Sequence, residues 1–159
     1  MATLPQLIEE DIHQLDDALS NLLRQSDATT ALIIDKGGFL ITHQGDCSDL
    51  DVTTIAALAS GAYMANQTIA NLIQEENFNS VYQQGEKNSM FALCVDANCL
   101  LVLIFKAQVA VGAVKYFSLP TAVKIARQIQ LAHERTPGLG LDLSVMNLAN
   151  PSELFKRKE

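Results

Sequence analysis

Apolar and small residues cover most of the circumference of one long helical segment, residues 49–77. One stripe at helical spacing consists of Ile55, Leu58, Ala59, Ala62, Ala65, Ile69, Leu72 and Ile73. A second stripe beside it consists of Ala56, Ala57, Ser60, Gly61 and Met64. No charged residue occurs between Asp51 and Glu75, and a helix that is apolar all round is buried on more than one side. We therefore expect one side to pack on the chain's own sheet and the other to meet a second protein.

The ends and the middle of this helix carry further signals. Ser48 and Asp51 have the spacing of an N-terminal capping box, and Asn77 is of a type that ends helices. Gly61 costs about 1 kcal/mol relative to Ala inside a helix, a cost that close approach of another backbone would offset. An Ala-rich core helix of a monomer is the alternative interpretation.

The remaining pattern predicts two more helices and five strands. The helices span residues 4–25 and about 118–135, with Ser118 as cap and Pro120 in the first turn. The strands are Thr29–Asp35, Phe39–Gln44, Phe78–Gln84, Ser89–Val95 and Cys99–Lys106. Residues 109–118 are ambiguous between helix and strand. Polar alternate positions in the third strand indicate a sheet edge, where a second subunit could extend the sheet.

Composition limits the function classes. The chain has 159 residues, enough for one domain with a core, and a formal net charge of −7. This charge argues against nucleic acid or an anionic membrane as the main ligand. Three cysteines without framework spacing, and a start without a signal-peptide pattern, favour a cytoplasmic protein with reduced thiols.

No candidate catalytic, cofactor-binding or metal-binding site emerges from the residues. His13, His43 and His133 fall in three different elements without ligand partners at helical spacing. Cys94 and Cys99 flank a short turn that places their side chains on opposite faces of the sheet, so a disulfide between them is disfavoured. We expect a protein without an active site of its own.

Several segments, taken in order, resemble the Roadblock/dynein light chain family and, within it, the bacterial MglB-type branch. They are ALIIDKGGFLITHQGD, IAALASGAYMANQTIANLI, FALCVDANCLLVLIF and VGAVKYF. The resemblance implies an α+β fold, profilin-like, with a five-stranded antiparallel sheet of order 2-1-5-4-3. Two helices would lie on one face of the sheet and the long helix on the other. The Roadblock domain would cover residues 1–135. The resemblance does not extend to residues 136–159. Their scattered apolar residues predict a C-terminal tail that is either packed on the domain or a loose terminus, with a short helix near residues 151–157.

The resemblance also implies a homodimer, formed through the long helices and the third strands, and a small Ras-like GTPase as partner. Carried over to this chain, the interface would comprise Ala56, Ala57, Ser60, Gly61, Met64, Val81 and Tyr82. MglB-type proteins stimulate GTP hydrolysis by an MglA-type GTPase. The long helix and the third strand contain no arginine to act as a finger, which favours selection of the GTPase's catalytic conformation. A scaffold subunit of a Roadblock assembly, a heterodimer with a paralogue and a small-molecule sensor are the alternatives.

Overall fold

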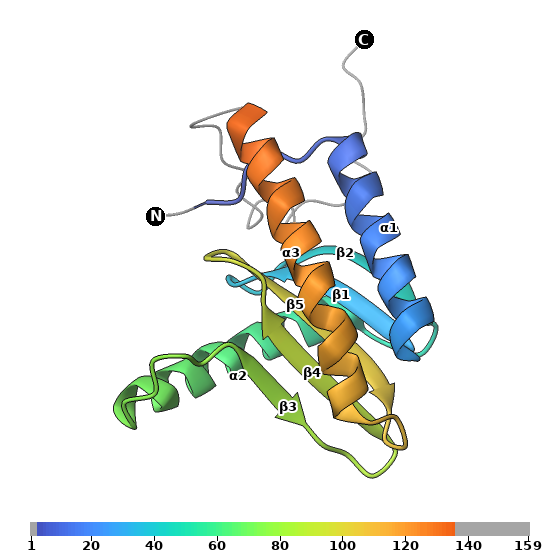
Figure 1. Ribbon diagram of the computed structural model, residues 1–159, viewed down its shortest axis with the longest axis vertical. Helices are drawn as coiled ribbons and strands as arrows, with labels where there is room; N and C mark the ends of the chain where they lie inside the picture. The colour runs from blue at the N-terminus through green and yellow to red at the C-terminus, as the bar shows by residue number, and fades with distance from the viewer. Residues whose placement is uncertain (1–2, 136–159) are drawn as a thin grey trace.

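A computed structural model describes residues 3–135, which fold into one sheet between two helical layers (Figure 1). The elements in chain order are α1 (Glu9–Ser26), β1 (Thr30–Asp35), β2 (Leu40–Gly45), α2 (Val52–Leu72), β3 (Ser80–Gln83), β4 (Asn88–Cys94), β5 (Cys99–Lys106) and α3 (Val111–Arg135). The strand order is β2-β1-β5-β4-β3, and all neighbours are antiparallel. Helices α1 and α3 lie side by side on one face, and α2 lies on the other. The predicted fold class is confirmed.

The central strands β1 and β5 divide the core into two parts by simple alternation. Ala31 and Ile33 of β1 face the core beneath α1 and α3, whereas Leu32 and Ile34 face the smaller core beneath α2. All four are fully buried. Successive side chains of a strand point to opposite faces, so a strand that reads as a continuous apolar run supplies both cores at once.

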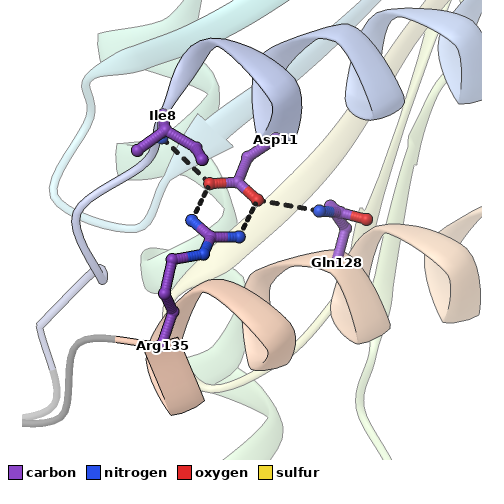
Figure 2. A network of polar contacts seen from close by, with 4 residues as sticks. All are labelled: Ile8, Asp11, Gln128 and Arg135. Carbon is purple, nitrogen blue, oxygen red and sulfur yellow. Dashed lines mark hydrogen bonds and ion pairs between the residues drawn. The ribbon is translucent and has the colours of Figure 1, made fainter.

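A buried ion pair joins the start of α1 to the end of α3 (Figure 2). The fully buried carboxylate of Asp11 accepts two hydrogen bonds from the Arg135 guanidinium, each 2.9 Å long. It also accepts bonds from the Gln128 side chain at 2.8 Å and from the Ile8 backbone N–H at 2.9 Å. The hydrogen bonds from Arg135 contribute most to lowering the pKa of Asp11 to about 2, although burial opposes the shift. Hydrogen bonds to both oxygens of the Asp11 carboxylate thus connect the start of α1 to the end of α3.

The first helix begins at Glu9, so the predicted start at residue 4 is wrong. Ile8 has an extended backbone, and its N–H is bonded by the Asp11 side chain, which fixes the first turn there. Leu4 is nevertheless buried and Leu7 packs on the same core. Their apolar spacing therefore reflects core packing of a non-helical segment.

The last helix begins at Val111, so the predicted start at Ser118 is also wrong. Ser118 is buried and donates its hydroxyl hydrogen to the Val114 carbonyl at 2.6 Å, a bond made inside a helix. Pro120 lies inside α3 on its exposed side. Proline has no N–H to donate to the carbonyl four residues earlier. Because that carbonyl is on the solvent side, water can hydrogen-bond to it, which reduces the loss of helix stability caused by the proline.

The long helix α2 is shorter than predicted at both ends. Asp51 alone caps it, accepting from the Thr54 N–H at 3.1 Å, whereas Ser48 bonds Asp46 instead. The helix ends before Ile73, and Gln74 takes the left-handed conformation predicted for Asn77. The predicted tail, residues 136–159, lies outside the described residues, as does its short helix near residues 151–157.

Candidate self-association and partner surface

The inner face of α2 packs on the sheet through mostly small side chains. Ala56, Ala59, Ser60, Tyr63 and Ala70 are its buried residues. The Ser60 hydroxyl donates to the Lys36 carbonyl in the turn between β1 and β2. In the same turn, a Cβ at Gly38 would come within 3.3 Å of the Ala57 Cα. The middle of α2 is therefore held close to the first hairpin.

Tyr63 is the one large side chain on this inner face. Its ring packs against that of Phe78, with the ring centroids 5.1 Å apart, and the Lys36 ammonium lies 5.7 Å from its centroid. Burial raises the pKa of Tyr63 far above its ordinary value, with a further contribution from Cys94. Tyr63 therefore stays neutral and acts as an anchor of α2.

The outer face of α2 carries large apolar side chains that touch little of this chain. Leu58 is 68% exposed, Ile69 54% and Leu72 79%, and Ile73 just past the helix is 72% exposed. Gly61, which lies between Leu58 and Ile69, has nothing within 4 Å of where a Cβ would stand. Contiguous exposed apolar surface of this kind marks an interaction site.

The C-terminal part of α2 extends past the edge of the sheet. Figure 1 shows this end of the helix projecting beyond β3. After Tyr63, only Ala70 of the helix is buried. The chain thus leaves about two turns of an uncharged helix without a sheet of its own beneath them.

The strand next to this overhang is an open edge. β3 pairs with β4 on one side and is the last strand of the sheet on the other. Val81 packs in the core beneath α2. Tyr82 points to the opposite face, where its ring stacks on Phe105 with 6.2 Å between centroids, and it is 39% exposed. The unpaired backbone of β3 can accept another strand.

The seven interface residues predicted from the sequence do not share one surface. Ala57, Gly61 and Met64 are exposed on α2, whereas Ala56 and Ser60 are buried in the chain's own core. Assigning the second stripe to the interface leaves the stripe that contains Leu58, Ile69 and Leu72 to pack on the sheet. The structure shows the reverse for these three residues, which form the outer face. A helix that is apolar all round has no polar side to show which stripe faces inward, so the sequence pattern could not separate them.

Charge is confined to the ends of this surface. Asp49 and Asp51 stand at its N-terminal end, and Glu75 and Glu76 at its C-terminal end. Hydrogen bonds from Thr54 lower the pKa of Asp51, so the cap is ionised at neutral pH. The arginines of the described region, Arg24, Arg127 and Arg135, lie in α1 and α3 on the opposite face of the sheet.

Residues 3–135 contain one close cysteine–histidine pair and no cluster of potential metal ligands. In this range no three His, Cys, Asp or Glu side chains are grouped so as to hold a metal ion. The Cys47 thiol lies 3.3 Å from Nδ1 of His43, but burial and the neighbouring Asp46 raise its pKa, which makes the thiol a poorer nucleophile. Within the same range, no helix is long and apolar enough to cross a membrane.

Comparison with known proteins agrees with this architecture. The model of the Roadblock/LC7 domain matches residues 14–105, and curated proteins give no match. The solved structure of MglB from Myxococcus xanthus is 24% identical over 80% of this chain and 96% of its own, with a TM-score of 0.73. The gliding protein MglB from Thermus thermophilus is 26% identical over 82% of this chain and 99% of its own, with a TM-score of 0.74.

A more distant likeness shows how general the fold is. Profilin II from Acanthamoeba castellanii is 13% identical over 72% of this chain and 98% of its own, with a TM-score of 0.54. This likeness concerns the fold alone. The domain model covers more than half of the chain, and the higher-scoring structures are MglB proteins. The chain therefore belongs to the Roadblock/LC7 family and, within it, is similar to MglB-type proteins.

Proposed function

We propose that this protein is a homodimeric regulator of a small Ras-like GTPase of the MglA type and that it accelerates GTP hydrolysis without an active site of its own. One observation carries the proposal. In a Roadblock-family chain similar to MglB, an uncharged apolar helix face projects past an unpaired edge strand. A cytoplasmic location accompanies the proposal and agrees with the three free cysteines.

In the proposed dimer, the β3 strands of two copies pair and their α2 helices cross. Pairing of β3 would join the two sheets, and the overhanging end of α2 would cover part of the other copy. Leu58, Ile69 and Leu72, together with Gly61 at the closest approach, would form the centre of the helix contact. Each large apolar side chain buried there contributes about 1.5–3 kcal/mol, so a few such residues suffice for a stable dimer. Ala57, Met64, Val81 and Tyr82 would contribute around this centre.

The GTPase would dock on the paired α2 helices, and this placement constrains the mechanism. An arginine finger accelerates phosphoryl transfer about 10³–10⁵-fold. The arginines of residues 3–135 lie across the sheet from α2, so the docking face supplies none. Stimulation would follow from tighter binding to the GTPase conformation that is ready for hydrolysis.

The second candidate function is a scaffold that binds the GTPase and leaves hydrolysis unchanged. The same observation favours it, because between Asp51 and Glu75 the face of α2 carries no charged side chain that could act on a phosphate. Binding alone needs only the apolar surface. The two candidates differ in a single measurable quantity, the turnover rate of the bound GTPase.

The deciding experiment is single-turnover hydrolysis of GTP by an MglA-type GTPase from the same organism, with and without this protein. Acceleration that saturates with added protein is the expected result. Nucleotide-dependent binding without acceleration would favour the scaffold. Absence of both would overturn the proposal. As a matched test of the mechanism, the double variant Arg24→Ala/Arg127→Ala should retain nearly full stimulation. A loss of about 10³-fold, the size of an arginine-finger effect, would show that one of these arginines acts directly.

A further inference from the structure

A groove that is open to solvent runs between α1 and α3, across the sheet from the proposed dimer surface. Its volume is about 380 Å³. Five of its lining residues belong to α1, and four, Lys124, Arg127, Gln128 and Leu131, belong to α3. Because α2 and β3 contribute nothing to its lining, the groove stays open when two copies associate through those elements.

The buried network of Figure 2 holds the two walls of the groove together. Gln128 lines the groove and donates a hydrogen bond to Asp11 of α1 at 2.8 Å. Arg135, about two turns further along α3, binds the same carboxylate through two hydrogen bonds. Walls that are already fixed relative to each other lose little conformational freedom when a ligand binds, which favours binding.

Two cations on the α3 wall have no acidic partner among residues 3–135. Lys124 and Arg127 both line the groove, and neither has a nitrogen within 4.0 Å of a carboxylate oxygen in this part of the chain. Asp17, the acidic residue of the opposite wall, lies 3.5 Å from Nε2 of His13 on its own helix instead. The α3 wall therefore presents unpaired positive charge, although the net charge of the chain is −7.

The amide side chains of the α1 wall bond along their own helix and do not reach these cations. Gln14 donates a hydrogen bond to Glu10 at 3.0 Å, and Asn21 accepts one from Arg24. Each bond joins residues three or four positions apart, the spacing of neighbours on one helix surface. The hydrogen bonds of the wall thus leave the two cations available for a ligand.

Apolar surface lies one helical turn from the cations. Leu131 follows Arg127 by four residues, about 6 Å along the helix axis, and is 46% exposed although it lines the groove. Ala18 of α1 lines the same groove and is half-buried. The groove is therefore complementary to a carboxylate and an apolar side chain that stand about 6 Å apart. Residues four positions apart on a helix have this spacing.

The charges of α1 restrict which acidic ligand fits. Helix α1 exposes Glu9 and Glu10, and Asp17 lines the groove itself. A nucleic acid or an anionic bilayer that reached Lys124 and Arg127 would also meet these carboxylates, and the like charges would repel. A free inorganic anion would leave the apolar surface unused. A narrow segment of a protein that carries one carboxylate next to an apolar side chain avoids both disadvantages.

We propose that the α1–α3 groove binds an acidic amphipathic helix of a partner protein. One carboxylate of that helix binds Lys124 and Arg127, and an apolar side chain one turn away packs on Leu131 and Ala18. Laying an amphipathic helix into a groove is a common mode of peptide recognition. The site is independent of the proposed action on a GTPase, because it lies across the sheet from α2. The protein would thus have two association surfaces on opposite faces of its sheet.

A designed peptide and methyl NMR of the full chain test this site. The probe is a capped, alanine-based peptide of about 15 residues, long enough to form a helix, with Glu and Leu four positions apart. We expect saturable shifts of the Ala18 and Leu131 methyl resonances. The variant Lys124→Glu/Arg127→Glu should weaken binding at least about tenfold, because two ion pairs are replaced by repulsion. This variant should instead bind a second peptide in which Lys replaces Glu.

Lys115→Glu is the matched control, because it reverses an exposed charge of the same helix outside the groove. It should leave peptide binding unchanged. Leu131→Ala, followed through Ala18, should weaken binding about fivefold, which tests the apolar half of the site. Equal binding of the Glu and Lys peptides to the parent chain would overturn the proposal.

Three other outcomes would assign the groove to a different occupant and would equally overturn the proposal. Inorganic phosphate that displaces the peptide at equal concentration would make the groove a simple anion site. Shifts of Ala18 and Leu131 that depend on protein concentration without peptide would indicate a second copy. Without peptide, the variant Lys124→Glu/Arg127→Glu should leave the methyl resonances of residues 136–159 unchanged. Changes there would indicate that the chain's own terminus is the occupant.

Discussion

Helices α2 and α3 lie on opposite faces of one sheet, and they differ in the size of most of the side chains that they bury. Toward the sheet, α2 places Ala56, Ala59 and Ser60, and it leaves larger apolar residues on the outside. Helix α3 buries Val114, Ile125 and Ile129. Its exposed side mixes apolar residues such as Tyr116 and Val123 with cations, whereas that of α2 is uncharged. A helix that contributes mainly small groups to its own core depends on another molecule to bury the rest. The comparison therefore assigns self-association to α2 and structural support to α3.

The largest expected effect is on the dimer dissociation constant, when a charge is placed on the exposed side of α2 rather than on that of α3. Leu72→Glu on α2 would bury a carboxylate in the proposed dimer twice, once per copy, and each unpaired charge costs several kcal/mol. We expect the dimer dissociation constant to rise at least about 10³-fold, measured by analytical ultracentrifugation. Val123→Glu, which is comparably exposed on α3, should leave the dimer mass unchanged. Equal effects of the two substitutions would remove the distinction between the helices.

The next largest effect concerns what fixes α3. Arg135→Gln would leave the buried Asp11 carboxylate without its cation, at a cost of about 3 kcal/mol in unfolding free energy. Arg127→Gln removes the same charge from the same helix, but Arg127 is exposed, so its cost should stay within about 0.5 kcal/mol. Urea unfolding of both variants makes the comparison. Similar midpoints would mean that the network of Figure 2 contributes little to holding α1 and α3 together.

The same ion pair predicts a dependence of stability on pH. The pKa of Asp11 is lowered from 3.8 to about 2 in the folded protein, so the folded state favours the ionised form. Its contribution of about 2 kcal/mol is complete above pH 4 and is lost as the pH falls through 2. In Arg135→Gln the main cause of the shift is absent. Urea midpoints between pH 4 and pH 2 should therefore fall less in this variant than in the parent chain.

The smallest effect compares one glycine in each helix. A Cβ at Gly61 or at Gly112 would meet nothing within 4 Å in the single chain. Either Gly→Ala change should raise the stability of the diluted monomer, by up to about 1 kcal/mol. Only Gly61→Ala should weaken the dimer, because its methyl group would separate the paired helices. Sedimentation of both variants over a range of concentrations decides the point, and a tighter Gly61→Ala dimer would move the contact elsewhere on α2.

Sequence patterns predict the strands well because the β-strands here are bounded by clear turns. Asp96 accepts hydrogen bonds from the N–H groups of Asn98 and Cys99, which forms the predicted turn between β4 and β5. The order 2-1-5-4-3 came with the family resemblance and agrees with the observed sheet. Short apolar and β-branched runs with turn residues on both flanks predict strands even where, as in β1 and β5, the run is continuous rather than alternating.

Helix boundaries and the orientation of α2 required the three-dimensional structure. A proline in a helical pattern usually marks the first turn of the helix. In α3, however, Pro120 lies in the middle of the helix, on the side that faces solvent. Asp11 reads as one more surface acid of α1, and only folding brings Arg135 to it from more than a hundred residues away. For α2, the choice of inner stripe was settled by Ser60 and Tyr63, whose partners lie in the first hairpin and before β3. Long-range contacts of this kind leave no periodic signal in one sequence.

The alternation along β1 and β5 has a consequence for how such a protein can diverge. Leu32 and Ile34 serve only the α2 side, and Ala31 and Ile33 only the other side. Substitutions on opposite faces of a sheet share few contacts, so their effects on stability are close to additive. After a gene duplication, the α2 layer could change its choice of partner while the α1 and α3 layer kept the domain folded. The sheet thus separates the part of the sequence free to acquire new associations from the part that must be preserved.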